Sequence, residues 1–327
     1  MARFRVRWGR LLATLCGVGL LVGGVRLFTA QLPPAPPHAR AEADLKALPE
    51  VEVCWLELSR SDVWGQLGTA GLTRTATWRN TASGLLVRHP QGDVLIDAGY
   101  SPNVHAEVEQ RPPLERFFNT VALRGLRDRS TLAAAFQQVG ASPERLKWFI
   151  PSHAHLDHLG GMVELRQVPV LLPAEEKALI EGWRTRKEVF SEHARAVEGR
   201  MTAMAFQPRP YENFDESFDV FGDGAVVVAR IPGHTPGSIA TFVNLSPERR
   251  LVHVGDTVNL VESVERRLPK STVLQLFTDT DSRAAREQVA RLSQLHEQAP
   301  GLHFLPAHDR DAWERFFGSA QRCVKAR

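Results

Sequence analysis

The chain has 327 residues, of which 43% are hydrophobic and 24% are charged, and it contains three cysteines. This length predicts one large domain of about 250 residues with an N-terminal extension, and it requires no second domain. The formal net charge is +3, but residues 1–40 hold six arginines and no acidic residue, and subtracting these six leaves −3 for residues 41–327. This mildly acidic body excludes nucleic acid as an expected partner.

The first thirty residues have the pattern of an export signal or a membrane anchor. Four arginines within residues 3–10 precede an apolar stretch over residues 11–25, and this order is typical of a signal peptide. Extending the stretch to residue 30 gives about twenty residues, enough to span a bilayer. We therefore interpret residues 1–30 as a signal peptide or an N-terminal membrane anchor. The positive flank predicts that the rest of the chain lies on the extracytoplasmic side of the cytoplasmic membrane.

A proline-rich segment separates this extension from the domain. Residues 31–50 carry four prolines within residues 33–37, and we expect an extended linker that spaces the domain from the membrane. Residues 51–327 are expected to form the domain. It contains Cys54 and Cys323, whose expected state is two free thiols, although an oxidising compartment would allow them to pair.

The domain mixes strand-like and helix-like patterns throughout. In its first half the expected strands are residues 51–58, 84–88, 94–96, 147–150 and 168–172, and the expected helices are residues 131–139, 174–184 and 191–197. In its second half the expected strands are residues 225–231, 238–243, 250–254 and 302–305, and the expected helices are residues 282–298 and 310–317. Because strands gather within each half and helices bracket them, we expect two packed sheets flanked by helices.

The densest group of metal-binding side chains follows the strand expected at residues 147–150. His153, His155, Asp157 and His158 lie within six residues, and two glycines follow shortly after. Alternate residues of a strand point to opposite faces, so the chain must turn for His153 and His155 to reach one ion, and the glycines permit a tight backbone nearby. Neutral imidazole and carboxylate ligands suit zinc first, with iron, manganese or cobalt as alternatives.

Three further candidate ligands each follow an apolar, strand-like run. His234 lies in a Pro-Gly-His-Thr-Pro-Gly-Ser turn, Asp256 follows a glycine, and His308 lies in an Ala-His-Asp sequence near the C-terminus. Loops at strand ends gather functional side chains on a rigid scaffold. We therefore predict that these three side chains complete the metal site that the first motif begins.

The order of these motifs resembles the metallo-β-lactamase superfamily of metal-dependent hydrolases. The resemblance rests on H-x-H-x-D-H, G-H-T-P-G-S, G-D and A-H-D, together with an early strand that ends in an aspartate, and it spans residues 51–312. It implies an α+β fold, an αββα sandwich of two mixed β-sheets flanked by helices, and two zinc ions per chain. The implied ligands are His153, His155 and His234 for one metal and Asp157, His158 and His308 for the other. Asp256 would bridge both metals, and Asp97 would support the metal loop without binding a metal itself.

The resemblance also implies an activity. A hydroxide that bridges the two metals would cleave a carbonyl bond of the ester type, in an ester or a lactone. Asp157 would orient this hydroxide and pass its proton to the leaving group. Asp256 stands where the true β-lactamases of the superfamily carry cysteine or serine, so we do not expect a β-lactamase. The ending at His308 looks like that of the lactonase-like branch, but Asn259 stands where acyl-homoserine lactonases carry a tyrosine. Asn259 is therefore the candidate contact for the substrate carbonyl.

Other activities on the same scaffold stay open. The alternatives are a thioester hydrolase and a non-hydrolytic, iron-binding redox protein, and the latter predicts iron as the dominant metal. A non-catalytic binding protein would hold metal without turnover. The expected partners are a small-molecule ester or lactone and, through the N-terminal segment, the membrane.

Overall fold

The computed structural model describes residues 32–35, 38–41, 43, 45, 47–64, 68–70, 77–185, 189–319 and 321–325. The predicted signal peptide or anchor over residues 1–30 lies outside these described residues. Among the residues that are described, no helix is long and apolar enough to cross a membrane. The description covers most of the predicted domain and much of the segment that leads into it.

Seven strands form the larger sheet. They are β1 (Glu52–Trp64), β2 (Thr77–Arg88), β3 (Asp93–Ile96), β4 (Leu146–Ile150), β5 (Val170–Leu172), β6 (Met201–Ala203) and β12 (Cys323–Lys325). Their spatial order is β12-β1-β2-β3-β4-β5-β6. The pairs from β12 to β3 are antiparallel, whereas those from β3 to β6 are parallel. The sheet is therefore mixed, and β3, β4 and β5 end at the same edge.

Five strands form the second sheet. They are β7 (Phe218–Asp219), β8 (Val226–Arg230), β9 (Ile239–Ser246), β10 (Arg249–His253) and β11 (Leu302–Leu305), in the order β11-β10-β9-β8-β7. Strands β10 and β11 are parallel, and the other pairs are antiparallel. Strands β8, β10 and β11 consequently run in the same direction, and their C-terminal ends share one edge.

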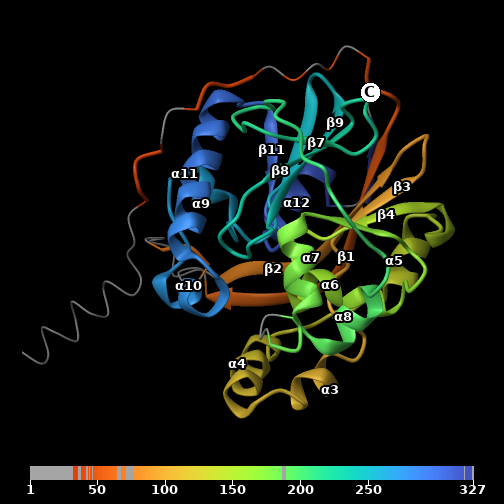
Figure 1. Cartoon of the computed structure of the whole chain (residues 1–327), viewed down its shortest axis with the longest axis vertical. Coiled ribbons are helices and arrows are strands. Elements are labelled where there is room, and N and C mark those ends of the chain that lie inside the picture. Colours follow the sequence, from red (N-terminus) through yellow and green to blue (C-terminus); the bar gives the residue numbers. More distant parts are fainter. Residues whose placement is uncertain are drawn as a thin grey trace, which may run out of the picture.

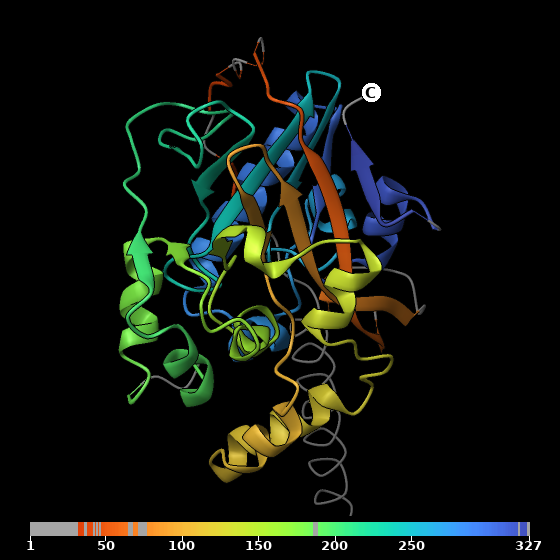
Figure 2. The ribbon, with the colours of Figure 1, turned by 90° about the vertical axis from the view of Figure 1, so that its right-hand side faces the viewer.

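Helices cover both outer faces of the paired sheets. They are α3 (Val104–Glu109), α4 (Pro113–Leu123), α5 (Leu132–Gln138), α6 (Leu156–Leu159), α7 (Ala174–Glu181), α8 (Ser191–Val197), α9 (Val261–Glu265), α10 (Thr272–Thr278), α11 (Ser282–Gln298) and α12 (Arg310–Phe317). Figure 1 shows α9 and α11 on one side and α5, α7 and α8 on the other, and Figure 2 shows α3 and α4 at one end of the molecule. The predicted αββα sandwich is confirmed.

Alternation along the central strands produces two apolar layers. On β1, Val53 and Trp55 join the core that both sheets share, whereas Cys54 and Leu56 join the layer beneath α5 and α7. Trp55 also packs against Trp313 of α12, with ring centroids 5.8 Å apart. Successive side chains of a strand point to opposite faces, so a strand that is apolar on both faces belongs in the interior of such a sandwich.

Eight elements were not predicted from the sequence. They are the helices α3, α4, α6, α9 and α10 and the short strands β6, β7 and β12. Helix α4 begins with a proline at its first helical position, where the missing N–H is not needed. The predicted elements all occur. Strand β1 extends six residues past its expected end and β2 begins seven residues before its expected start, whereas the others lie within about three residues of their expected bounds. Both α4 and α10 lie at the end of the molecule that carries the strand-end loops described below (Figure 1).

The described part of the proline-rich segment contacts the domain. Leu32 packs against the shared core. Arg291 of α11 donates to the ring of His38 at 3.1 Å, and Arg40 donates to the main-chain oxygen of Gln298 at 3.0 Å. The segment therefore lies along α11 where it is described.

Cys54 and Cys323 form a disulfide. The two residues are opposite each other in the antiparallel pair of β1 and β12. Although 269 positions separate them in the sequence, the antiparallel pairing of β1 and β12 brings them together. The expectation of two free thiols is therefore wrong.

Candidate metal centre

All seven predicted ligands lie at one edge of the two sheets, in the segments that follow β4, β8, β10 and β11. His153 follows β4 and leads into α6, which carries Asp157 and His158. His234 follows β8, Asp256 follows β10, and His308 follows β11. Because these strands all end at the same edge, side chains that are far apart in the sequence converge there.

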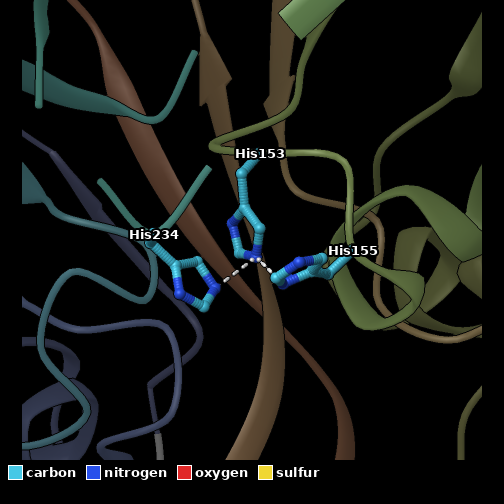
Figure 3. A group of neighbouring side chains, drawn as sticks. All are labelled: His153, His155 and His234. Carbon is cyan, nitrogen blue, oxygen red and sulfur yellow. Dashed lines mark hydrogen bonds between the residues drawn. The ribbon is translucent and has the colours of Figure 1, made fainter. Parts of the chain in front are cut away.

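The first group contains His153, His155 and His234. Their ligand atoms lie within 4.8 Å of one another. His153 Nε2 is 2.9 Å from His155 Nδ1 and 3.1 Å from His234 Nε2, and Figure 3 shows the three rings converging. Nitrogen ligands of a tetrahedral zinc ion are separated by about 3.3 Å, given zinc–nitrogen bonds of about 2.0–2.1 Å. The observed separations are close to this value.

The second group contains Asp157, His158, Asp256 and His308, again with ligand atoms within 4.8 Å of one another. Asp256 lies between the groups: its carboxylate is 3.0 Å from His308 Nε2, 3.4 Å from His158 Nε2 and 3.7 Å from His234 Nε2. The structure thus brings together both predicted ligand sets and puts Asp256 in the position expected of a bridge.

Burial and charge give the two groups different protonation states. Burial, with the nearby His234, lowers the pKa of His155 to about 3. Burial alone would lower the pKa of His308, but Asp256 and Asp157 raise it to about 10. The first group therefore offers neutral imidazole nitrogens directly. Since a metal needs deprotonated ligands, loading of the second group must release protons.

Buried partners fix the orientation of three ligand rings. The Nδ1 atom of His158 is 2.7 Å from the Asp97 carboxylate, that of His234 is 2.7 Å from Asp279, and that of His308 is 2.8 Å from the main-chain oxygen of Thr81. An acceptor at Nδ1 holds the proton there and leaves Nε2 free to bind a metal. Sequence reasoning identified Asp97 and missed Asp279.

A lysine reinforces the contact to His234. The ammonium group of Lys270 is buried and donates to Asp279 at 2.7 Å. Burial opposes ionisation, but Lys270 and His234 lower the pKa of Asp279 to about 2. An ionised Asp279 is a stronger acceptor for the His234 ring. Lys270 and Asp279 lie on either side of α10, in a segment for which the sequence offered no metal motif.

Asp97 also positions the loop that carries the first motif. Its carboxylate accepts from the Ser152 amide at 2.6 Å and from the Ser152 hydroxyl at 2.8 Å. Asp97 has a positive φ of 58°, a conformation that aspartate and asparagine adopt more readily than most residues. The predicted support of the metal loop by Asp97 agrees with this geometry.

We expect Asp97→Asn to weaken metal binding by about 10–100-fold, because a neutral amide cannot accept from both Ser152 and His158 as a carboxylate does. Asparagine tolerates the positive φ, so the backbone should be retained. Metal content at buffered free zinc would measure the effect, with far-ultraviolet circular dichroism as the check on folding. An unchanged affinity would show that Asp97 has no such role.

Two glycines let the motif pack against the loop after β3. A Cβ atom on Gly160 would lie 2.5 Å from the Ser101 amide nitrogen, and one on Gly161 would lie 2.1 Å from the Ala98 carbonyl oxygen. No side chain fits at such distances. The glycine pair predicted to permit a tight backbone therefore allows α6 to approach the loop that contains Asp97.

Glu176 of α7 connects two metal loops. Its buried carboxylate accepts from the Ala154 amide at 2.6 Å, the Thr235 hydroxyl at 2.8 Å and the Gly237 amide at 3.0 Å. Ala154 lies between His153 and His155, so Glu176 holds the first motif against the turn of His234. Burial raises the pKa of Glu176 to about 7 despite these donors.

This raised pKa predicts a pH dependence of stability. The folded chain favours the neutral acid, so the associated stability is present below pH 4.5 and declines as the pH rises through about 7. Glu176→Gln, which imitates the neutral acid, should remove this part of the decline. Thermal unfolding of metal-free protein at about pH 5 and about pH 8 would measure it. Equal pH dependence in both proteins would contradict the assignment.

Two atoms of the second group make no hydrogen bond. His158 Nε2 and Asp256 Oδ1 are buried and lack a hydrogen-bond partner among the described residues. Buried polar atoms are normally satisfied, and each exception needs an explanation. A cation among these atoms would satisfy both, and the donor set of five imidazoles and two carboxylates suits zinc. The residues present therefore fit a pair of metal ions.

Tyr100 is a site residue that sequence reasoning missed. Its hydroxyl hydrogen-bonds to Asp157, and burial, followed by the charges of Asp157 and Asp256, raises the pKa of Tyr100 well above its usual value. It lies in the loop after β3, which the motif pattern did not single out.

The amide of Asn259 is buried and donates to the main-chain oxygen of Gly68 at 3.5 Å. Its predicted contact with a substrate carbonyl stays a prediction.

Known proteins with similar sequences are hydrolases by name. An N-acyl homoserine lactonase, AttM, of Azorhizobium caulinodans is 25% identical over 239 residues, which cover 71% of this chain and 82% of that protein. A probable metallo-hydrolase of Mycobacterium tuberculosis is 24% identical over 238 residues, covering 70% of this chain and 75% of that protein.

Solved structures show the same fold. An N-acyl homoserine lactone hydrolase, with N-hexanoyl-L-homoserine bound at its catalytic metal centre, matches with a TM-score of 0.59 at 17% identity and covers 82% of this chain and 97% of that chain. The dizinc lactonase AidC matches with a TM-score of 0.54 at 15% identity, covering 81% of this chain and 90% of that chain. The family model of the metallo-beta-lactamase superfamily matches residues 76–315. With this match over most of its length, the chain belongs to the metallo-beta-lactamase superfamily of metal-dependent hydrolases.

Proposed function

We propose that this protein is a dinuclear zinc hydrolase that cleaves the ester or lactone bond of a small molecule. The observation that carries the proposal is the position of Asp256 between two complete ligand groups, within 3.7 Å of histidines from both. The names of the related lactonases support a lactone as the first substrate to test.

The donor set defines what each part of the centre would do. His153, His155 and His234 would hold one zinc ion, and the second group would hold the other. Bound zinc supplies Lewis-acid activation of a carbonyl and of the attacking water. The chain's own contribution is acid–base chemistry. Burial opposes ionisation of Asp157, but His158 and His308 lower its pKa to about 2, so its carboxylate is ionised and can accept a proton from water and release it to the leaving oxygen.

Tyr100 would assist this proton transfer by fixing the Asp157 carboxylate. Hydrogen bonds to charged groups contribute about 1.5–3 kcal/mol, so Tyr100→Phe should lower kcat/KM by about 10–100-fold. Metal content should stay unchanged, because the hydroxyl is not among the ligand atoms. Tyr211→Phe is the matched control, since Tyr211 is the chain's other tyrosine and its hydroxyl bonds to Asn244 and Arg250. Equal activities of the two variants would contradict the role.

We also propose that the domain works outside the cytoplasm, anchored in or exported across the cytoplasmic membrane. The sequence of residues 1–30 motivates this location. The Cys54–Cys323 disulfide supports it, because disulfides persist in oxidising compartments and are rare in the cytosol.

The test of the proposed activity starts from the purified full chain. We would measure its metal content and compare hydrolysis of an acyl-homoserine lactone, an aryl ester and a thioester, with Asp157→Ala as the control. About two zinc ions per chain and activity that the substitution abolishes are expected. Iron as the dominant metal without hydrolysis would refute the proposal and favour a redox protein. Metal without turnover would favour a binding protein.

A further inference from the structure

One end of the molecule carries an exposed apolar surface. Six large hydrophobic side chains on α4 and α10 are between 37% and 70% exposed. They form what we call the apolar surface: Leu114, Phe117, Phe118, Val121, Leu276 and Phe277. Soluble domains rarely gather exposed side chains of this size, and such a patch usually marks an interaction site.

The two helices form one continuous surface. The rings of Phe118 and Phe277 have centroids 4.3 Å apart, and those of Phe117 and Phe118 are 5.5 Å apart. The surface also adjoins the metal centre, because Phe277 lies two positions before Asp279, which contacts the ligand His234 at 2.7 Å.

Charged residues around α4 suit a negatively charged partner. Glu115 pairs with Arg111 at 2.8 Å and adds no unbalanced negative charge to this helix. Arg116 is exposed on the same helix, and Arg124 is exposed directly after the end of that helix. Arginine side chains beside an apolar face can reach phosphate groups while their aliphatic parts stay among the apolar side chains.

The path of the N-terminal segment leads toward this surface. Going backward along the chain, Arg40 contacts Gln298 at the end of α11, and His38 contacts Arg291, about two helical turns earlier in α11. The segment therefore runs antiparallel to α11, toward the start of that helix. Helix α11 begins at Ser282, four positions after α10 ends, and Figure 1 shows α10 beyond that end of α11.

The distance to the predicted anchor is short. Leu32 packs against the domain, and the predicted anchor ends at residue 30. Two residues span at most about 7 Å, at about 3.3–3.6 Å per residue. An anchor that ends at residue 30 would thus keep the domain near the bilayer, and the chain would reach the bilayer from the α10 end of the domain.

From these observations we infer that the apolar surface of α4 and α10 docks on the lipid bilayer that holds the N-terminal segment. The apolar side chains enter the interface, and Arg116 and Arg124 meet lipid phosphates. Docking in this orientation places the metal centre beside the membrane surface. The inference rests on the proposed membrane location and is independent of the hydrolytic activity.

Fluorescence of labelled full-length chain in vesicles tests this docking. Cys16→Ala removes the cysteine outside the disulfide, and Leu276→Cys introduces an environment-sensitive label on the apolar surface. The matched control is Glu248→Cys in the exposed turn between β9 and β10. This turn lies at the C-terminal end of β9. The other end of β9 begins at Ile239, whose amide donates to the main-chain oxygen of Ser152 at the metal loop. The vesicles contain phosphatidylcholine and phosphatidylglycerol, with or without nitroxide-labelled lipid.

We expect nitroxide lipid to quench the Leu276→Cys label by about twofold or more and to leave the Glu248→Cys label nearly unchanged. Leu114→Cys on α4 is a second, independent position with the same expectation. Equal quenching at both ends, in protein that floats with the vesicles, would overturn docking while keeping the membrane location. If the environment of the labels becomes apolar but nitroxide lipid does not quench them, the apolar surface would instead be covered by a second copy of the chain. Full-length chain that does not float with the vesicles would overturn both the location and the docking.

Discussion

Asp256→Asn is expected to reduce kcat/KM for the hydrolysed ester or lactone by about 10³-fold or more and to lower the affinity for both metals. The carboxylate lies 3.7 Å from His234 of the first group and 3.0 Å from His308 of the second. Asparagine keeps the size of the side chain but removes the negative charge that would balance two cations. The loss should therefore exceed that caused by changing a residue that contacts one group alone.

Metal content and steady-state kinetics at buffered free zinc would measure both effects of Asp256→Asn. Asp93→Asn is a suitable control, because Asp93 is also a buried aspartate but its carboxylate accepts from Arg145. The Oδ1 atom of asparagine can still accept from the Arg145 guanidinium group, so the control should retain metal and activity to within a few-fold. Two bound metals and normal turnover in Asp256→Asn would exclude a bridging role.

The sequence predicted the ligand groups because each ligand follows a recognisable strand and lies in a compact motif. His153 to His158 form one run, and His234, Asp256 and His308 follow apolar runs in a distinctive order. The side chains that orient these ligands had no such signal. Asp279 and Glu176 lie in segments of ordinary composition, and only the tertiary fold brings them to His234 and Ala154. Tyr100 also lies in a segment without a motif, and only the tertiary fold brings its hydroxyl to Asp157.

The sequence predicted strands better than the helices near the metal centre. β-Branched runs such as residues 226–230 are typical of buried strands, and β8 occurs there. Helices α4 and α10 expose much of their apolar surface, so the usual pattern of one buried and one polar face does not identify them. Strand β12 is three residues long and depends on its pairing with β1.

Removing the disulfide by the double substitution Cys54→Ala and Cys323→Ala should lower the free energy of unfolding by about 2–4 kcal/mol. The bridge closes a loop of 269 positions, and long loops lose the most conformational entropy in the unfolded chain when they are cross-linked. It also ties the short edge strand β12 to β1. For a domain of this size we expect a decrease in Tm of about 2–4 °C for each kcal/mol.

Thermal unfolding of the oxidised wild type, the reduced wild type and the double variant would separate the effect of the bond from that of the lost side chains. Reductant should lower the Tm of the wild type toward that of the variant and leave the variant unchanged. Because Cys54 is fully buried, alanine at this position also leaves a small cavity. The double variant should therefore unfold at a slightly lower Tm than the reduced wild type, and this difference measures the effect of the cavity. A wild type insensitive to reductant, with two free thiols by titration, would show that the bond does not form. The disulfide would then no longer support a location outside the cytoplasm, and that location would depend on the N-terminal sequence alone.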